Sequence, residues 1–387
     1  MIFTNKSNQC FYINNREYIS KLCIIRGVVC GMKIKLAILD KNYNYLTRIA
    51  SVLSNKFADK LEIYSFTDEK VAMDTLGELK IDVLLSSDSF EIDTNTLTSK
   101  CGFAYFVESP GIESLNGQRV ICKFQKGELI YKEVLSLYSE NVANKTGFKL
   151  DSNSSSSVLI FASASGGVGS STIAAACSIA LAKRGKTVLY LNMEQCGNAN
   201  SIFNAPGQFD FSDVIYAVKS KKSNLGLKLE STVKQDPTGV CFYDPCDVAL
   251  DMTEITSEDI RSLLTQLTLS GAYQYIVIDT SFRFDKAFVE YTKISSNVVL
   301  VTDGSEISNM KLRRAYDALA IYEQQQEVPI LQKLSLMYNK FSNKTGIPTD
   351  IENLNVIGGA QRFEHATYRE IVNQLSSLNF VEKLMDR

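Results

Sequence analysis

The chain has 387 residues, 45% hydrophobic and 22% charged, which is the composition of a globular protein with two or three domains. Lys and Arg number 41 against 43 Asp and Glu, so the net charge of −2 gives no strong nucleic-acid signal. The single histidine, His365, argues against a His-rich metal site. No apolar run reaches transmembrane length, and nine cysteines without a CxxC pair favour reduced, cytoplasmic thiols.

Residues 1–31 are Asn-rich and have no clear helical or strand period. Two interpretations of this extension stay open. Either translation starts at Met32, or the segment is a short arm packed on the first domain.

Residues 32–145 alternate strand and helix patterns, which predicts a first α/β domain with a parallel sheet covered by helices. The predicted strands are 33–40, 61–66, 81–87, 103–109 and 118–124, and the predicted helices are 43–57, 68–79 and 127–142. Residues 146–157 (TGFKLDSNSSSS) are polar and Ser-rich, which indicates a linker.

Residues 158–387 alternate again and predict a second α/β domain, doubly wound like the first. The predicted strands are 158–163, 187–192, 273–279, 297–303 and 333–339. The predicted helices are 170–185, 212–220, 257–271, 307–325 and a final helix over 368–387.

A glycine-rich loop, residues 164–172 (ASGGVGSST), joins an apolar strand to an Ala-rich helix. Its three glycines let the backbone curl so that the N–H groups point inward, and the helix N-terminus behind them completes a nest for an anion. Ser171 stands where a hydroxyl can reach a magnesium ion. The candidate ligand-binding residues of the loop are Ser165, Gly166, Gly167, Val168, Gly169, Ser170, Ser171 and Thr172.

The loop has a rival interpretation as a dinucleotide fingerprint that has lost its last glycine, with Glu194 as the ribose-binding carboxylate. A site for a nucleoside triphosphate instead needs a carboxylate on a neighbouring strand to hold magnesium. Asp279 ends strand 273–279 and supplies it. The wider pattern therefore favours a triphosphate over a dinucleotide.

Residues 165–172 resemble the deviant P-loop of the MinD/ParA ATPases, normally K-G-G-x-G-K-[ST]-[ST]. Residues 192–199 (NMEQCGNA) are similar to their D-x-D-P-Q-G-N-A switch segment, and 277–280 (VIDT) resemble their Walker B strand. Asn339, in 337–340 (MYNK), resembles the Asn that reads the adenine edge. The resemblance implies ATP and Mg²⁺ as ligands, with Ser171 and Asp279 at the metal.

Three charged positions of that family are replaced here. Ser165 stands at the signature lysine, Ser170 at the P-loop lysine and Asn192 at the first switch aspartate. Because phosphoryl transfer depends on stabilising charge in the transition state, losing one such donor typically costs ~3 kcal/mol. We therefore expect ATP binding with slow or absent hydrolysis, and an active form would be a slow Mg-dependent ATPase. Glu194 is the candidate water-orienting carboxylate.

The first domain resembles a response-regulator receiver. Asp40 ends the first strand where receivers place magnesium-binding acids, but Lys41 replaces the usual second acid. Ser87 stands at the phospho-accepting aspartate, and Asp88 comes one residue late, so its side chain is expected to face the other way.

The downstream hydroxyl and lysine positions of a receiver are filled by Ser109 and Lys123. Without the acceptor and the acid pair, aspartyl phosphorylation is not expected. We interpret the domain as a pseudo-receiver used for docking, with another flavodoxin-like domain as the alternative.

A degenerate receiver followed by a MinD-like ATPase resembles the TadZ/CpaE proteins of tight-adherence pilus systems, and residues 251–260 (DMTEITSEDI) are also similar to that group. The resemblance implies a homodimer, stabilised by ATP, that marks a cell site. It implies the pilus secretion ATPase and platform proteins as partners. The expected localisation is cytoplasmic, at a cell pole or at the inner face of the membrane through those partners.

Two other functions remain as alternatives. An active partition or positioning ATPase would use Lys219, Lys221 and Lys222 as a DNA patch, although a solvated helix end is the favoured interpretation of these lysines. The final helix could lie on a membrane, but its few basic residues favour core packing.

An electron-transfer ATPase like the nitrogenase iron protein would need cysteines placed to bridge an iron–sulfur cluster. Cys241 and Cys246 precede the Walker B strand, and no cysteine follows Asp279, so the pattern does not match.

Overall fold

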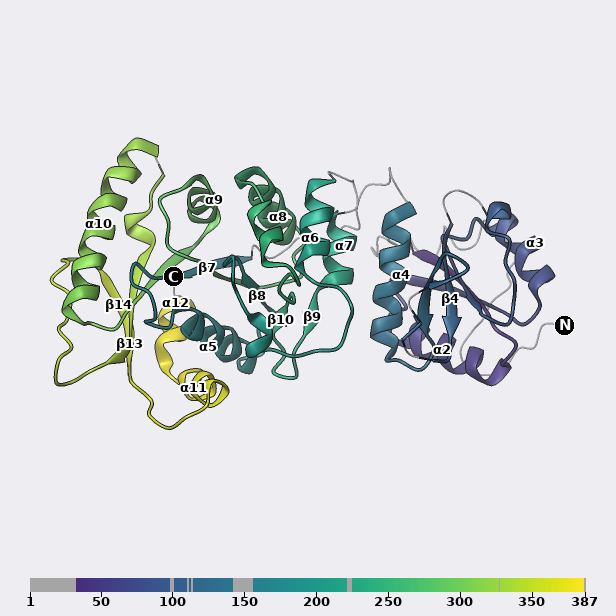
Figure 1. Cartoon of the computed structure of the whole chain (residues 1–387), viewed down its shortest axis with the longest axis horizontal. Coiled ribbons are helices and arrows are strands. Elements are labelled where there is room, and N and C mark those ends of the chain that lie inside the picture. The colour runs from purple at the N-terminus through teal and green to yellow at the C-terminus, as the bar shows by residue number, and fades with distance from the viewer. Residues whose placement is uncertain are drawn as a thin grey trace, which may run out of the picture.

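The computed structural model describes residues 33–97, 101–109, 111–112, 114–141, 156–220, 225–326 and 328–385. The extension 1–31 and residues 146–155 of the expected linker lie outside the described residues. Two sheets with helices packed on both faces form the two parts of the molecule (Figure 1). The prediction of two α/β units is therefore confirmed.

The first sheet has the order β2-β1-β3-β4-β6-β5, and every neighbouring pair is parallel except β5 and β6. Its strands are β1 Ile34–Leu39, β2 Leu61–Phe66, β3 Val83–Ser87, β4 Gly102–Val107, β5 Ser114–Leu115 and β6 Gln118–Cys122. Its helices are α2 Tyr43–Lys56, α3 Glu69–Leu79 and α4 Gly127–Asn141, with a 3-10 turn, η1, over Thr94–Thr96. The strand order places the carboxyl ends of β1, β3 and β6 on one edge.

Apolar faces hold these helices on the sheet. Leu53 of α2 and Val134 of α4 pack into one cluster of buried residues on one face, and Leu76 of α3 packs into another on the opposite face. Short polar side chains start α2 and α3, because Asn42 and Asp68 each accept a hydrogen bond from a first-turn N–H group.

The second sheet has the order β14-β13-β12-β7-β11-β8-β10-β9, with only the β9–β10 pair antiparallel. Its strands are β7 Ser157–Ala162, β8 Val188–Asn192, β9 Lys234–Gln235, β10 Cys241–Phe242, β11 Tyr275–Asp279, β12 Asn297–Thr302, β13 Leu334–Phe341 and β14 Asn355–Gln361. The central strands are buried on both faces, as is typical of parallel strands that helices cover on both sides. β7 lies between β12 and β11, so the P-loop that follows it sits at the middle of the sheet.

Helices cover both faces of this second sheet (Figure 1). They are α5 Ser170–Lys183, α6 Phe211–Lys219, α7 Leu225–Thr232, α8 Ser257–Leu269, α9 Lys286–Ile294, α10 Glu306–Gln326, α11 Tyr368–Leu375 and α12 Glu382–Met385. The 3-10 turns are η2 Ala199–Ser201, η3 Ala249–Thr253, η4 Leu331–Lys333 and η5 Asn379–Val381. α5 and α11 share one face, while α6, α8, α9 and α10 pack on the other.

The expected final helix over 368–387 is wrong as a single element. α11 ends at Leu375, Leu378 takes an extended backbone conformation, and η5 and α12 follow as short separate turns. The apolar residues of this segment are nevertheless in the core, since Val372, Leu375 and Leu384 are buried in the same cluster as the apolar residues of α5. Core packing is thus the correct interpretation of its apolar face.

The two domains meet where α4 contacts α7 (Figure 1). Glu230 of α7 accepts a hydrogen bond from the Tyr131 hydroxyl at 3.2 Å and pairs with Lys60. Gln208 of the second domain donates to Glu133 of α4 at 2.6 Å. Among the described helices, none combines the length and the apolar character that crossing a bilayer requires.

Candidate functional site

The P-loop leaves β7 and enters α5 through a left-handed turn. Gly167 and Gly169 have φ values of +77° and +88°, a region that favours glycine. Gly169 is the N-cap of α5, and no side chain caps the first amides of that helix. The loop therefore offers its backbone N–H groups and the positive end of the helix to an anion.

Asp279, at the carboxyl end of β11, is fully buried beside the loop. Its Oδ2 accepts hydrogen bonds from the Tyr190 hydroxyl at 2.7 Å and from Asn192 Nδ2 at 2.9 Å, both on β8. Its Oδ1 is buried without a hydrogen-bond partner. One oxygen of this carboxylate is therefore held by the sheet, and the other remains available.

Burial raises the pKa of Asp279 to about 7, and the nearby Glu194 carboxylate adds to the rise. The hydrogen bond from Tyr190 and the nearby Ser171 hydroxyl both oppose this rise of the pKa. A carboxylate in this state is stabilised in its ionised form by any cation that reaches it. The same surroundings raise the pKa of Tyr190 well above its usual value, so its hydroxyl stays a donor.

The segment after β8 brings the other candidate carboxylate to the loop. Glu194 Oε2 lies 3.5 Å from Ser171 Oγ, and the Glu194 N–H donates to Asn192 Oδ1 at 3.1 Å. Gly197 packs so closely that a Cβ there would lie 1.8 Å from Asn192 Oδ1. The turn thus depends on a glycine that lets Asn192 point back towards Asp279.

A magnesium ion fits the donor set at this point. Ser171 and Asp279 supply hard oxygen ligands, and the orphaned Oδ1 of Asp279 is a buried acceptor that a cation would satisfy. Within the described ranges, no group of three or more His, Cys, Asp or Glu side chains could hold a metal ion. Phosphate oxygens and water would have to complete the coordination of Mg²⁺, as is usual for this ion.

Asn339 ends up against the P-loop, although it is far from it in sequence. It is 2% exposed, and its Nδ2 donates to the Val168 carbonyl at 2.8 Å. A Cβ on Gly169 would lie 2.5 Å from that same nitrogen. The next residue, Lys340, also reaches the loop, because its Nζ donates to the Gly167 carbonyl at 2.8 Å.

A cavity of about 440 Å³ opens beside Glu194, between the ends of β8 and β11. Thr280 and Ser281 line it, together with Arg283 and Asp285, whose side chains form an ion pair at 2.7 Å. These polar groups share the lining of the cavity with apolar side chains, among them Met252, Ile260 and Phe288.

Residues that the alternative functions needed lie elsewhere. Lys219 forms an ion pair with Asp259 at 3.8 Å, and Lys221 and Lys222 lie outside the described residues. Burial raises the pKa of Cys241 to about 11, and it raises that of Cys246. Burial therefore favours the neutral thiol at both positions.

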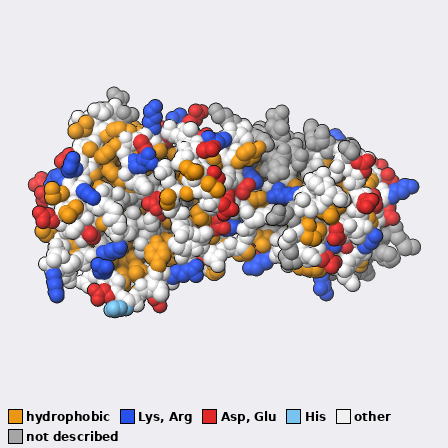
Figure 2. Space-filling model, in the orientation of Figure 1, with side chains coloured by type: hydrophobic (Ala, Val, Ile, Leu, Met, Phe, Trp, Pro, Cys, Tyr) orange, Lys and Arg blue, Asp and Glu red, His pale blue; other side chains and the backbone are white. Residues whose placement is uncertain are grey.

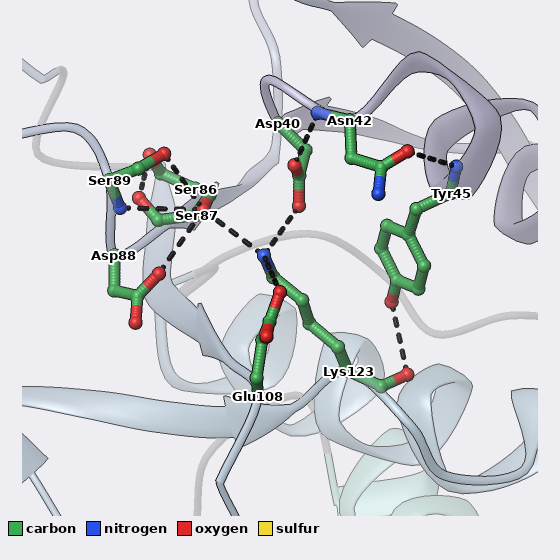
Figure 3. Close-up of polar contacts among 9 residues, drawn as sticks. All are labelled: Asp40, Asn42, Tyr45, Ser86, Ser87, Asp88, Ser89, Glu108 and Lys123. Atoms are coloured by element: carbon green, nitrogen blue, oxygen red, sulfur yellow. Dashed lines mark hydrogen bonds and ion pairs between the residues drawn. The ribbon is translucent and has the colours of Figure 1, made fainter.

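The receiver-like domain has its own polar cluster at the carboxyl edge of its sheet (Figure 3). Lys123 Nζ lies 2.8 Å from Asp40 Oδ2, 3.1 Å from Ser87 Oγ and 3.9 Å from Glu108 Oε1. Lys123 and Asp40 are 6% and 3% exposed. The lysine that would face a phosphoryl group in a receiver is therefore occupied by the domain's own side chains.

Asp88 points away from this cluster's ion pair, as its position after Ser87 predicts. It is exposed and accepts from Ser87 Oγ at 3.2 Å (Figure 3). Ser109 is exposed after β4, and Lys41 donates to the Ser89 carbonyl at 3.2 Å. No second carboxylate joins Asp40 where receivers hold their acid pair among the residues drawn in Figure 3.

Tyr190, Lys340 and Glu108 also contact these sites, and they were not predicted from the sequence. Tyr190 has a signal in the sequence, because it lies two residues before Asn192 and a strand places such residues on one face. Glu108 follows β4 directly, at the edge where the site lies. Lys340 has no such signal, because an ideal strand would turn it away from the side that Asn339 occupies.

The two domains define a class of protein: a receiver-like unit followed by a P-loop unit of the ParA/MinD type. Residues 32–139 match the model of the TadZ-like receiver domain, and residues 156–328 match that of the AAA domain. The chain therefore has the domain architecture of the TadZ/CpaE-like proteins. No curated protein sequence matches the chain.

Solved structures similar to the chain include a ParA family ATPase from Chlorobium tepidum, at 20% identity and a TM-score of 0.46. The match covers 60% of this chain and 93% of the ParA family ATPase. A MinC:MinD cell division complex from Aquifex aeolicus has 18% identity and a TM-score of 0.44. The match covers 60% of this chain and 97% of the matched chain of that complex. A putative plasmid partition protein from Borrelia burgdorferi bound to AMPPNP has 19% identity and a TM-score of 0.45. The match covers 60% of this chain and 96% of the partition protein.

Proposed function

We propose that this protein is an ATP-binding scaffold that localises the assembly of a Flp/Tad-type pilus or a related secretion machinery. The TadZ-like receiver model and the ParA/MinD-type domain support this assignment. In this proposal ATP stabilises a homodimer, and hydrolysis is weak or absent. The partners are the secretion ATPase and platform proteins of the machinery, at a cell pole or the inner face of the membrane.

The observation that carries the proposal is a P-loop with a formed backbone and neutral side chains. Gly167 and Gly169 have the left-handed backbone of an anion nest. Ser165 and Ser170 stand where the MinD/ParA pattern has its two lysines. Backbone amides can hold phosphate groups, but the charge that stabilises a transferring phosphoryl group is reduced.

Each candidate residue has a role in this proposal. The amides of residues 165–172 bind the phosphates, and Ser171 and Asp279 hold Mg²⁺. Glu194 orients water during slow turnover, and Asn339 contributes to the nucleotide site from β13. ATP bound with Mg²⁺ would satisfy the orphaned Oδ1 of Asp279.

The test is a titration of the full chain with ATP and Mg²⁺, in which molecular mass and phosphate release are followed together. We expect binding, a rise in mass to that of a dimer, and little phosphate. Fast turnover would contradict the proposal and favour an active partition ATPase, and so would stimulation of turnover by DNA. Figure 2 shows basic and acidic side chains interspersed on the face in view, which does not favour a DNA-binding surface there.

A further inference from the structure

Two successive residues of β13 contact the same P-loop. Asn339 Nδ2 donates to the Val168 carbonyl, and Lys340 Nζ donates to the Gly167 carbonyl, each at 2.8 Å. Side chains of neighbouring residues in a strand point to opposite faces. The strand must therefore depart from regular geometry at this point to send both side chains to one loop.

The departure is visible in the backbone. The register between β13 and β14 shifts between Tyr338 and Phe341, which is a β-bulge or irregularity across Asn339 and Lys340. Lys340 itself has φ of +58°, a left-handed conformation that a lysine rarely adopts. Bulges re-aim side chains next to binding sites, and strained residues persist where the surrounding structure holds them. The left-handed backbone at Lys340 thus coincides with the turn of its side chain towards the P-loop.

Charge explains why a cation is needed at that place. ATP carries several negative charges, and Glu194 and Asp279 add two carboxyl groups beside the loop. The two loop positions that carry lysine in the MinD/ParA pattern are Ser165 and Ser170. Among hydrogen bonds recorded between described residues, Lys340 provides the one ammonium or guanidinium donor to the loop.

We propose that Lys340 is the cation that binds the β- and γ-phosphates of the nucleotide in this chain, in place of the absent loop lysines. The inference rests on the proposed ATP binding. Lysine has three donors on a flexible four-carbon stem, so its Nζ can keep the Gly167 carbonyl as one acceptor and take a phosphate oxygen as another. The exposed position of Lys340 leaves that movement free.

Two variants of Lys340 distinguish the effect of its charge from the effect of its hydrogen bond to the P-loop. Lys340→Gln keeps a donor for the Gly167 carbonyl and removes the charge, while Lys340→Arg keeps the charge. Lys344→Gln is the matched control, because Lys344 is an exposed lysine of the following loop. Dissociation constants of ATP, ADP and AMP are measured with Mg²⁺ by calorimetry on the full chain, and the thermal unfolding midpoint without nucleotide checks each fold.

We expect Lys340→Gln to weaken ATP and ADP binding about tenfold or more, since hydrogen bonds to charged groups are the strong ones. AMP binding should change by less than about threefold. Lys340→Arg keeps the positive charge and should weaken ATP binding less than Lys340→Gln does, and Lys344→Gln should bind ATP like the parent. An equal loss for ATP and AMP would mean that Lys340 only braces the loop and would overturn the inference. Unchanged ATP binding in Lys340→Gln, with the parent binding normally, would overturn it while leaving the proposed function intact. A parent chain that binds no nucleotide would contradict both.

Discussion

Lys123 and Asp40 form an ion pair 2.8 Å long in which both side chains are at most 5% exposed. The pair lies where a receiver domain would place its conserved lysine and its metal-binding acid. Ser87 Oγ accepts a hydrogen bond from the same ammonium group at 3.1 Å. The partners of the lysine are therefore side chains of its own domain (Figure 3). The cluster is thus held together by the charges and the hydroxyl group of its own side chains.

The first prediction concerns this pair. Lys123→Met leaves the Asp40 carboxylate buried without its partner, and removing one member of a buried pair typically costs about 3–5 kcal/mol. We expect the urea midpoint of the first domain's unfolding to fall, by an amount that corresponds to this loss in the free energy of unfolding. Tyrosine fluorescence and circular dichroism would record it for each domain's transition.

The control for this variant neutralises both charges. Lys123→Met combined with Asp40→Asn removes the unpaired carboxylate and keeps an acceptor for the Asn42 N–H, which bonds Asp40 Oδ1 at 2.8 Å. We expect the double variant to recover most of the lost stability. A double variant no more stable than Lys123→Met would show that packing of the lysine stem, and not charge, holds the cluster.

Strands with continuous apolar runs were predictable from the sequence, and elements with weak patterns were not. The prediction of a strand over 33–40 corresponds to β1, Ile34–Leu39. β14, Asn355–Gln361, was not predicted because its sequence, NVIGGAQ, has two adjacent glycines and little strand propensity. In the final segment the apolar residues keep a helical spacing through the residues that separate α11 from α12. Periodicity alone therefore predicted one helix where the structure has two.

In the candidate site, too, some residues were predictable from the sequence and others were not. The order of loop, Glu194, Asp279 and Asn339 along the chain indicated one site, because parallel strands deliver their carboxyl ends to one edge. The contacts that modify its chemistry depend on strand order and on local backbone irregularities. Tyr190 reaches Asp279 because β8 and β11 are neighbours, and Lys340 reaches the loop because of the register shift in β13.

The second prediction uses the raised pKa of Asp279, about 7 in the folded chain against an ordinary value of 3.8. Between these values the folded state holds a proton that the unfolded state releases, so the free energy of unfolding falls as pH rises and levels off above about 7. Asp279→Asn removes this contribution. Relative to the parent, the variant should gain stability by at most ~1.4 kcal/mol per pH unit between about pH 4 and pH 7.

Urea unfolding of both chains at pH 5 and pH 8 measures that gain. Comparing the change with pH cancels any constant cost of the substitution, such as a weaker bond from Tyr190. A difference between the two chains that does not vary with pH would contradict a raised pKa at Asp279.

A third prediction restores the loop lysine. Ser170→Lys places an ammonium group where the MinD/ParA pattern has its phosphate-contacting lysine. Phosphate release should then rise, by roughly a hundredfold if one transition-state donor is regained. Ser170→Gln, of similar length and without charge, is the control and should release phosphate as slowly as the parent. Equal rates in the parent and both variants would show that the missing charge at 170 does not limit turnover.

A fourth prediction concerns Gly197, where a Cβ would lie 1.8 Å from Asn192 Oδ1. Gly197→Ala should displace the Asn192 amide, which donates to Asp279 at 2.9 Å. Leaving that buried carboxylate short of a donor costs about 1–3 kcal/mol. Gly166→Ala is the matched control, because a Cβ at Gly166 meets no atom within 4 Å. Differential scanning calorimetry should show a lower unfolding temperature for Gly197→Ala alone, and similar values for the two variants would contradict the contact.

The last prediction concerns the contact between the domains. Glu230 of α7 pairs with Lys60 and accepts from the Tyr131 hydroxyl at 3.2 Å, so it joins the receiver-like domain to the second domain. Glu230→Lys sets an ammonium beside Lys60, and like charges across an interface cost several kcal/mol. We expect the two domains to separate, which small-angle X-ray scattering would record as a larger maximum dimension. Adding Lys60→Glu reverses the pair and should restore the compact dimension, because opposite charges meet again. If Glu230→Lys leaves the scattering unchanged, the contact does not hold the domains together, and if the reversed pair fails to restore it, the pairing of these two charges is not the cause.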